Sequence, residues 1–181
     1  MTTVTETTVT TAWHSTVDTP VGPFTAVVDN DEAVLAAGWT DSLDELLSGI
    51  HPALRPREPV ERADLGAVTS AVRAYHAGEL TAIDDIEVRQ HSGEFIEHAW
   101  KMLRGVTPGR PVTYTEFAEL AGRPAAVRAA AAACARNSAA LFVPCHRVIR
   151  TDGGLGGFRW GVDVKRWLLD HESDLGVIPG M

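Results

Sequence analysis

Apolar residues near the start of the chain occur in short runs that turn residues interrupt. Residues 13–29 (WHSTVDTPVGPFTAVVD) break at TPVGP, and residues 32–40 (EAVLAAGWT) follow an Asp/Asn turn. Short apolar runs bounded by Pro, Gly, Asp and Asn are typical of strands. The pattern therefore predicts a small sheet near the N-terminus.

A helical period follows this predicted sheet. Residues 64–80 carry apolar side chains at positions 65, 68, 72 and 75, and Gly78 is placed to end a helix. Residues 83–89 (IDDIEVR) predict a brief extended segment. This part of the chain contains no cysteine and no evident catalytic cluster. We therefore expect residues 13–92 to form an α/β scaffold domain, a small sheet plus a helix.

Helical patterns dominate after residue 93. Apolar residues at 95, 99, 103 and 106 share one face of a helix that ends at the Pro108-Gly109 turn. Thr113 can cap a short helix that Gly122 ends, and Pro124 suits the first position of a second helix that reaches about Arg136. This pair predicts either a helix-turn-helix or an αα-hairpin in a core, which is the commoner use of two such helices.

The second predicted helix has an unusual composition. Residues 129–133 are all alanine, so one face has little bulk and can approach another surface closely. Arg128 is a lone long cation near the N-terminal end of this helix, where free N–H groups attract phosphate. The arrangement suits insertion into a DNA groove, but tight packing against a neighbouring helix explains the alanines equally well.

The charged residues divide the chain into an acidic and a basic half. The 181 residues with 45% apolar content are enough to bury a core. Residues 1–94 hold 5 Lys/Arg against 16 Asp/Glu, which is −11, whereas residues 95–172 hold 11 against 7, which is +4. Such a difference in charge can mean that the basic half of the chain binds nucleic acid, but more often the charges only keep the surface solvated. We expect disorder in the Thr-rich residues 1–12, a mainly α domain over residues 93–174, and a short tail at 175–181.

Cysteine content and hydropathy exclude several classes of protein. Two cysteines cannot form a disulfide framework, and no CxxC pair or zinc-type spacing is present. No stretch reaches the ~18 apolar residues of a membrane span. We therefore expect a cytoplasmic protein with no membrane association and no bound metal.

The stretch LFVPCHRVIR at residues 141–150 contains the strongest candidate for chemistry. Residues 141–143 predict a short strand, and Pro144 would end it and hold Cys145 rigidly, although a lone cysteine more often only packs. A thiol attacks as thiolate, so it needs a base and a group to orient that base. His146 is adjacent, but neighbours in an extended segment point apart, which favours a bridging water. Glu172 is the candidate orienting group.

Several blocks in order resemble the O6-alkylguanine-DNA alkyltransferase family. These are PCHRVI, the preceding RPAAVRAAAAACARN and the following GGLGGFRWGVDVKRWLLDHE. The resemblance begins at DTPVGPF and is strongest over residues 111–172, which are especially similar to the C-terminal half of the bacterial adaptive-response protein. One tetrapeptide is a weak motif, but the ordered blocks are highly specific.

The resemblance implies single-turnover repair of O6-alkylguanine, with O4-alkylthymine as a second candidate substrate, in double-stranded DNA and without a cofactor. Cys145 would accept the alkyl group and be consumed. His146 would take the thiol proton through a water, and Glu172 would orient His146. Asn137 would hold the active-site turn, and Tyr114 would protonate the departing guanine and help to rotate the nucleotide.

The same resemblance implies contacts to DNA and to the flipped base. Arg128 would enter from the minor groove and fill the space that the base leaves, which offsets part of a flipping cost of roughly a few kcal/mol. The other DNA contacts implied are Tyr114, Thr113, Thr115, Ala126, Ala129 and Arg136. The residues implied to bind the base, some of them in a lid loop (GGLGGFRWG), are Cys134, Val148, Gly157, Phe158 and Arg159.

Some positions depart from the family pattern. Ala131 and Ala132 stand where glycines are common, and Ser138 follows Asn137 where proline is common. The N-terminal part has no cysteine for the zinc site of some relatives, so we expect surface positions or local hydrogen bonds for its histidines, which are His14, His51, His76 and His91. A cysteine hydrolase and a non-catalytic DNA-binding helix-turn-helix protein remain as alternatives. No obligate protein partner is expected.

Overall fold

A four-stranded mixed sheet forms the first part of the protein. The computed structural model describes residues 11–175, except for the side chains of the last two. The strand order is β3-β2-β1-β4, in which only the β1–β4 pair is parallel. The strands are β1 (Ala12–Thr19), β2 (Gly22–Asp29), β3 (Val34–Gly38) and β4 (Val60–Glu61). The first three confirm the predicted strands and their break at TPVGP, and β1 already includes Ala12.

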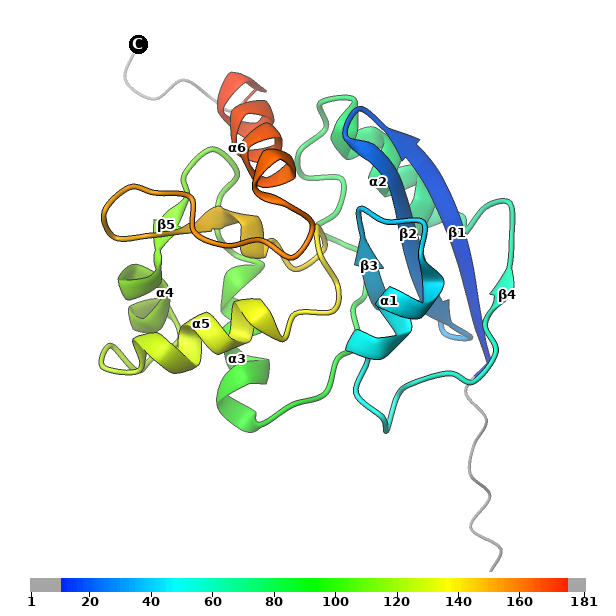
Figure 1. Ribbon diagram of the computed structural model, residues 1–181, viewed down its shortest axis with the longest axis horizontal. Coiled ribbons are helices and arrows are strands. Elements are labelled where there is room, and N and C mark those ends of the chain that lie inside the picture. Colours follow the sequence, from blue (N-terminus) through cyan, green and yellow to red (C-terminus); the bar gives the residue numbers. More distant parts are fainter. Residues whose placement is uncertain (1–10, 176–181) are drawn as a thin grey trace, which may run out of the picture.

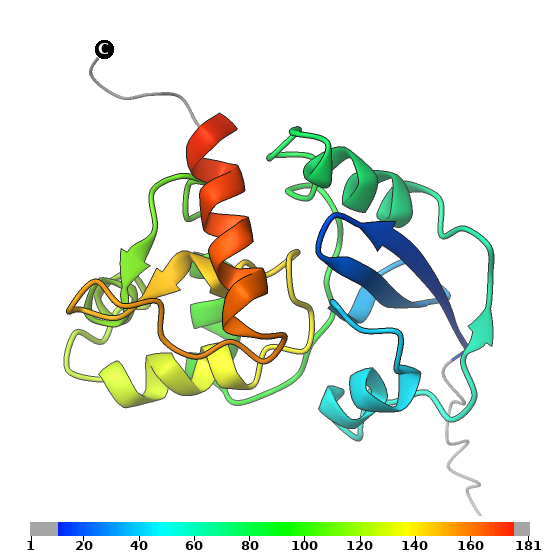
Figure 2. The same cartoon turned by 45° about the horizontal axis from the view of Figure 1, so that its top comes forward.

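Two helices cover opposite faces of this sheet (Figure 2). The predicted helix is present as α2 (Ala67–His76), which buries Val72 and Tyr75 in the large core on one face. A second helix, α1 (Leu43–Gly49), was not predicted, and it packs Leu46 against a smaller apolar cluster on the other face. The sheet is therefore buried on both sides.

Of two further predicted extended segments, residues 83–89 are confirmed only at their end, where Glu87 and Arg89 bond to Val34, and residues 141–143 are wrong. Residues 81–85 form turns, and only Val88 makes a strand-like bridge, to Val34. Residues 140–143 also form a turn, in which Leu141 has a φ of 74°. Both segments carry buried apolar side chains, such as Ile83 and Phe142, and a short apolar run does not by itself distinguish a strand from another buried segment.

The second part of the protein is mainly helical. Its elements are α3 (Glu94–Leu103), β5 (Val112–Thr113), α4 (Tyr114–Leu120), α5 (Val127–Ala135), the 3-10 turn η1 (Cys145–Arg147), β6 (Val148–Ile149) and α6 (Val162–Leu175). Thr113 caps α4 in a capping box with Glu116, as predicted for the cap, and Gly122 follows this helix with a φ of 88°. The predicted first position at Pro124 is wrong, because residues 124–126 form a turn and α5 begins at Val127.

The two parts lie side by side, with α6 along their boundary (Figure 1). One apolar cluster runs through both and includes Phe24, Tyr75, Phe142 and Leu168. The chain also bridges the parts directly, because Ala37 at the end of the sheet pairs with Ala139. Among residues 11–175, no helix is long and apolar enough to cross a membrane.

Candidate active site around Cys145

The turn before Cys145 is held by hydrogen bonds to Asn137. The Asn137 amide nitrogen donates to the carbonyl of Val143 at 2.8 Å. Its amide oxygen accepts from the backbone N–H of Ala139 and from Nε2 of Gln90, both at 3.0 Å. A buried amide satisfied in this way fixes the turn. Cys145 follows at the start of η1, so the thiol has a defined position.

Ser138 connects the same turn to the sheet. Its backbone N–H donates to Oε1 of Gln90 at 2.9 Å, and its hydroxyl donates to the carbonyl of Leu35 at 2.9 Å. Proline has no N–H and no hydroxyl to make these contacts. The pairing of Ser138 with Gln90 therefore explains why serine is suitable where relatives often have proline.

A pocket of about 360 Å³ opens onto Cys145. It brings together seven of the residues expected from the sequence: Tyr114, Cys134, Asn137, Cys145, Gly157, Phe158 and Arg159. The remaining lining residues are Ala131, Ala135 and Trp160; Trp160 belongs to the expected lid loop, whereas neither alanine was expected in the pocket. The two alanines lie on α5 where the small side chains leave the pocket open.

The loop over this pocket is anchored to the first part of the protein. A Cβ at Gly38 would lie 2.2 Å from the Trp160 ring, so the indole rests directly on the end of β3. The guanidinium of Arg159 donates to the carbonyl of Glu45 in α1. On the other side, a Cβ at Gly156 would lie 3.3 Å from the Tyr114 hydroxyl, and this glycine has a φ of 75°. The lid thus depends on elements distant in sequence.

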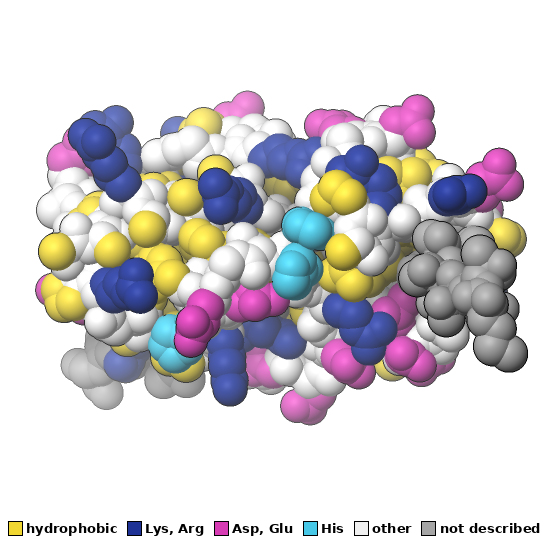
Figure 3. Space-filling view, turned by 90° about the horizontal axis from the view of Figure 1, so that it is seen from below, with side chains coloured by type: hydrophobic (Ala, Val, Ile, Leu, Met, Phe, Trp, Pro, Cys, Tyr) yellow, Lys and Arg dark blue, Asp and Glu magenta, His cyan; other side chains and the backbone are white. Residues whose placement is uncertain are grey.

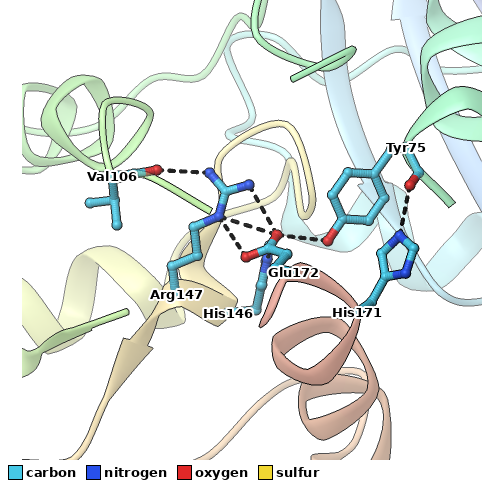
Figure 4. Close-up of polar contacts among 6 residues, drawn as sticks. All are labelled: Tyr75, Val106, His146, Arg147, His171 and Glu172. Carbon is cyan, nitrogen blue, oxygen red and sulfur yellow. Dashed lines mark hydrogen bonds and ion pairs between the residues drawn. The ribbon is translucent and has the colours of Figure 1, made fainter. Parts of the chain in front are cut away.

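Glu172 accepts hydrogen bonds from three buried side chains (Figure 4). Its Oε2 accepts from Nε2 of His146 at 2.8 Å and from the hydroxyl of Tyr75 at 2.7 Å. Arg147 adds bonds of 3.0 Å from Nε to Oε1 and from Nη2 to Oε2, and its Nη1 donates to the carbonyl of Val106. Burial opposes ionisation of Glu172, but His146 and Arg147 hold its pKa well below the usual range.

This network determines the tautomer of His146. An ionised carboxylate only accepts, so Nε2 of His146 carries the hydrogen and Nδ1 is the unprotonated nitrogen. Nδ1 is buried and has no hydrogen-bond partner among the residues that the structure describes. Burial lowers the pKa of His146, against the attraction of Glu172. The ring is therefore a neutral base whose free nitrogen is available to a proton from the pocket.

Lys165 places a second charge near the thiol. Its ammonium group is buried and donates to the carbonyl of Val148 at 2.8 Å and, at 3.4 Å, to that of Gly157 in the lid. Burial raises the pKa of the Cys145 thiol, while Asn137 and Lys165 act in the opposite direction. Burial also raises the pKa of Cys134. Both groups are thiols at neutral pH, but only Cys145 lies beside His146.

The other expected residues lie outside the pocket. Val148 is buried, and Arg128 is exposed on α5. The remaining candidates for DNA contact lie on α4 and α5 or at the ends of these helices: Thr113, Thr115, Ala126, Ala129 and Arg136. Thr115 is exposed, with its hydroxyl 3.3 Å from that of Thr151, and Arg136 is exposed at the end of α5.

Four site residues were missed at the level of sequence. Lys165 was detectable as a charge among the apolar residues of its helix, and Arg147 as part of the PCHR run. Tyr75 was placed only in the apolar face of a helix, and nothing in the sequence indicated Gln90. Their partners lie 8 to 97 positions away along the chain.

Histidines of the first part make local contacts. His76 accepts from Nε1 of Trp39 at 3.3 Å, and the exposed rings of His51 and His91 lie 4.5 Å apart. His14 is half-buried in β1. Within residues 11–175, no three His, Cys, Asp or Glu side chains are grouped to hold a metal ion.

Comparison with known sequences finds related proteins along most of the chain. The family model for the DNA-binding domain of 6-O-methylguanine DNA methyltransferase matches residues 94–174. A methylated-DNA–protein-cysteine methyltransferase of Shigella flexneri is 35% identical over 159 residues, which cover 87% of this chain and 93% of that protein. The bifunctional transcriptional activator/DNA repair enzyme Ada of Escherichia coli is 48% identical over 80 residues, 44% of this chain and 23% of that protein.

Comparison with solved structures finds the same fold. The O6-methylguanine methyltransferase of Mycobacterium tuberculosis superposes with a TM-score of 0.73 at 27% identity, covering 94% of this chain and 96% of that one. A structure of Mycobacterium tuberculosis OGT in complex with DNA gives a TM-score of 0.76 at 29% identity, with coverage of 90% and 93%.

Proposed function

The chain belongs to the methylated-DNA–protein-cysteine methyltransferases and is an enzyme of direct-reversal DNA repair, and we propose that Cys145 is its alkyl acceptor. The observation that carries this assignment is the pocket onto which the Cys145 thiol opens, together with the next residue in the chain, the buried His146, whose Nδ1 has no hydrogen-bond partner among the residues that the structure describes. Cys134 lines the same pocket, but among the residues that the structure describes no histidine or amide side chain bonds to its thiol.

The proposed reaction is a single displacement at carbon. The Cys145 thiolate attacks the carbon bound to O6, so an S–C bond forms as the C–O bond breaks. The electron pair leaves with guanine, which takes up a proton. Because a thioether has no good leaving group at sulfur under these conditions, the protein acts once, and no cofactor is needed.

We propose that His146 removes the thiol proton through one water at Nδ1. The tautomer set by Glu172 leaves this nitrogen as the acceptor, and the raised pKa of Cys145 means that the thiolate must be generated during the reaction. Lys165 then stabilises the negative sulfur from close range. Asn137 keeps the turn in place while charge develops.

Tyr114 is the proposed donor to the departing guanine. Its hydroxyl faces the lid at Gly156, and burial raises its pKa, so the group keeps its proton until the base requires it. The lid residues Gly157, Phe158 and Arg159 would bind the base, with Cys134 as pocket wall. Val148 would contribute its carbonyl, which already accepts from Lys165 and retains a second lone pair.

We propose that α4 and α5 act as a helix-turn-helix on the minor groove. Small alanines on α5 permit close approach, and the exposed Arg128 would replace the flipped nucleotide in the stack. Thr113, Thr115, Ala126, Ala129 and Arg136 would contact the strands around it. Residues 13–92 and 93–174 would act as two domains, and the two free thiols suit a reducing cytoplasm.

Mass spectrometry of intact protein and peptides tests this proposal. A short duplex with one O6-methylguanine is mixed with wild type, Cys145→Ser and the matched control Cys134→Ser. We expect one methyl group per wild-type molecule, located on Cys145, retained in Cys134→Ser and absent from Cys145→Ser. Methylation of Cys134, or repeated turnover without modification, would overturn the assignment.

A further inference from the structure

A second hollow, of about 370 Å³, lies next to the Cys145 pocket. The two share Ala135 and Arg159 in their linings, so they adjoin at the end of α5. Cationic side chains and imidazoles from both parts of the protein surround this second hollow, which we call the arginine hollow: Arg55, Arg136, Arg159, His51 and His91. Figure 3 shows adjoining histidine side chains near the centre of one face, with Lys or Arg side chains to either side.

Two of the three arginines, Arg55 and Arg159, are held in position by backbone carbonyls. Arg55 donates from Nε and Nη2 to the carbonyl of Ile50, at 3.0 and 2.8 Å, and from Nη2 to that of Ser48. Arg159 donates to Glu45 across the lid. A Cβ at Gly49 would lie 2.8 Å from Nη1 of Arg159, so the glycine leaves room for this guanidinium. Such contacts fix direction without neutralising charge.

These charges lack the acidic partners that solvated arginines often have. Within residues 11–173, no carboxylate lies within ion-pair distance of Arg55, Arg136 or Arg159, although seven other basic side chains or histidines do form such contacts. The only acidic contact at the rim joins Glu97 to His91, at 3.7 Å. The hollow is distinguished by the gathering of three such guanidinium groups around one space in a protein of net charge −8.

The guanidinium group of arginine binds phosphate through its N–H donors, of which it has five. Arg55 uses the donors of Nε and Nη2 for backbone carbonyls, so those of Nη1 remain for a phosphate. A strand whose nucleotide enters the Cys145 pocket carries a phosphate at each nucleotide, so neighbouring phosphates must pass the rim of that pocket. We propose that the arginine hollow binds a backbone phosphate of this strand. The proposal rests on the proposed function, and it assigns a DNA contact to the otherwise acidic N-terminal part.

Equilibrium binding tests this proposal in the unreactive Cys145→Ser protein. Arg55→Gln removes one charge but keeps an amide donor for the carbonyls, and Arg57→Gln is the matched control, because Arg57 is exposed nearby and does not line the hollow. Fluorescence anisotropy with a labelled duplex containing O6-methylguanine is measured from low to physiological salt. Thermal melting of each variant confirms that it is folded.

We expect Arg55→Gln to weaken binding several-fold at low salt and to reduce the slope of log affinity against log salt by about 1, the value for one lost phosphate contact. Arg57→Gln should leave both quantities unchanged. Equal affinities and slopes in the two variants would overturn the proposal. Methylation of Cys145 in wild type is scored separately, so a failure of the proposed reaction cannot be confused with a failure of the arginine hollow.

Discussion

The two parts of the protein differ in charge and in chemistry, yet they share one core. The part before residue 93 is acidic and holds no cysteine, whereas the part after it is basic and holds Cys145, His146 and Glu172. The groups proposed to react all come from the second part, but the contacts that position them come partly from the first. Tyr75 donates to Glu172, Gln90 bonds both Asn137 and Ser138, and Trp160 rests on Gly38.

The comparison shows that a part of the protein without a proposed reactive group can still position the groups of the site. A buried polar network holds its members in place through its hydrogen bonds, and here some of the donors come from the other part of the chain. Substitutions on either side of the boundary should therefore separate loss of chemistry from loss of position.

Glu172→Gln should have the largest effect, because it removes the charge that holds His146 and Arg147. We expect at least a 100-fold slower methyl transfer in single-turnover assays and a loss of about 3 kcal/mol in unfolding free energy. Because the pKa of Glu172 is depressed in the folded state, its stabilisation is present above about pH 4.5 and declines as the pH falls toward the folded-state pKa. The stability gap should therefore narrow in acid. Exposed Glu79→Gln is the control and should match wild type.

Lys165→Met should have the next largest effect, a roughly tenfold slower transfer, because the developing thiolate loses the buried cation that favours its charged form. In wild type, burial already raises the pKa of Cys145 above the ordinary 9.0, so alkylation by iodoacetamide should accelerate only in alkaline solution. The variant should move this rise to still higher pH. Arg166→Met, at the exposed neighbouring position, should leave the profile in place. An unchanged thiol profile in Lys165→Met would assign the lysine to lid structure alone.

Tyr75→Phe tests the contribution of the first part to the same carboxylate. Loss of the hydroxyl costs about 1.5 to 3 kcal/mol for a bond to a charged group. The carboxylate then attracts protons on His146 more strongly, so the pKa of His146 should rise and the acid limb of the rate profile should move to higher pH. Transfer near neutral pH should slow a few-fold. Ser15→Ala, which removes the bond from another buried hydroxyl to Ala63, should lower stability without moving the profile.

Sequence alone predicted the first three strands and most helices from local periodicity, and it predicted seven of the residues that line the pocket from the ordered motifs of the family resemblance. It did not predict the two-residue strands β4, β5 and β6, which are too short to leave a pattern. It failed where a short apolar run was ambiguous, as at residues 141–143, where burial is achieved by a turn. It also failed for Tyr75, Gln90 and Lys165, since each bonds to a residue distant in sequence. Helical periodicity placed Tyr75 in a core, but no local pattern shows which acceptor its hydroxyl meets there.

Ser138→Pro should have the smallest effect of these changes. It tests the contacts between Ser138, in the second part of the protein, and Gln90 and Leu35, in the first. Proline removes the N–H bond to Gln90 and the hydroxyl bond to Leu35, while Asn137 keeps its own contacts to Val143 and Ala139. We expect a loss of about 1 to 2 kcal/mol in chemical denaturation and a transfer rate within a few-fold of wild type. Ser138→Ala keeps the N–H bond and should lose about half as much. If Ser138→Pro were as stable as wild type, the link through Gln90 would have no energetic role, and Asn137 alone would hold the turn.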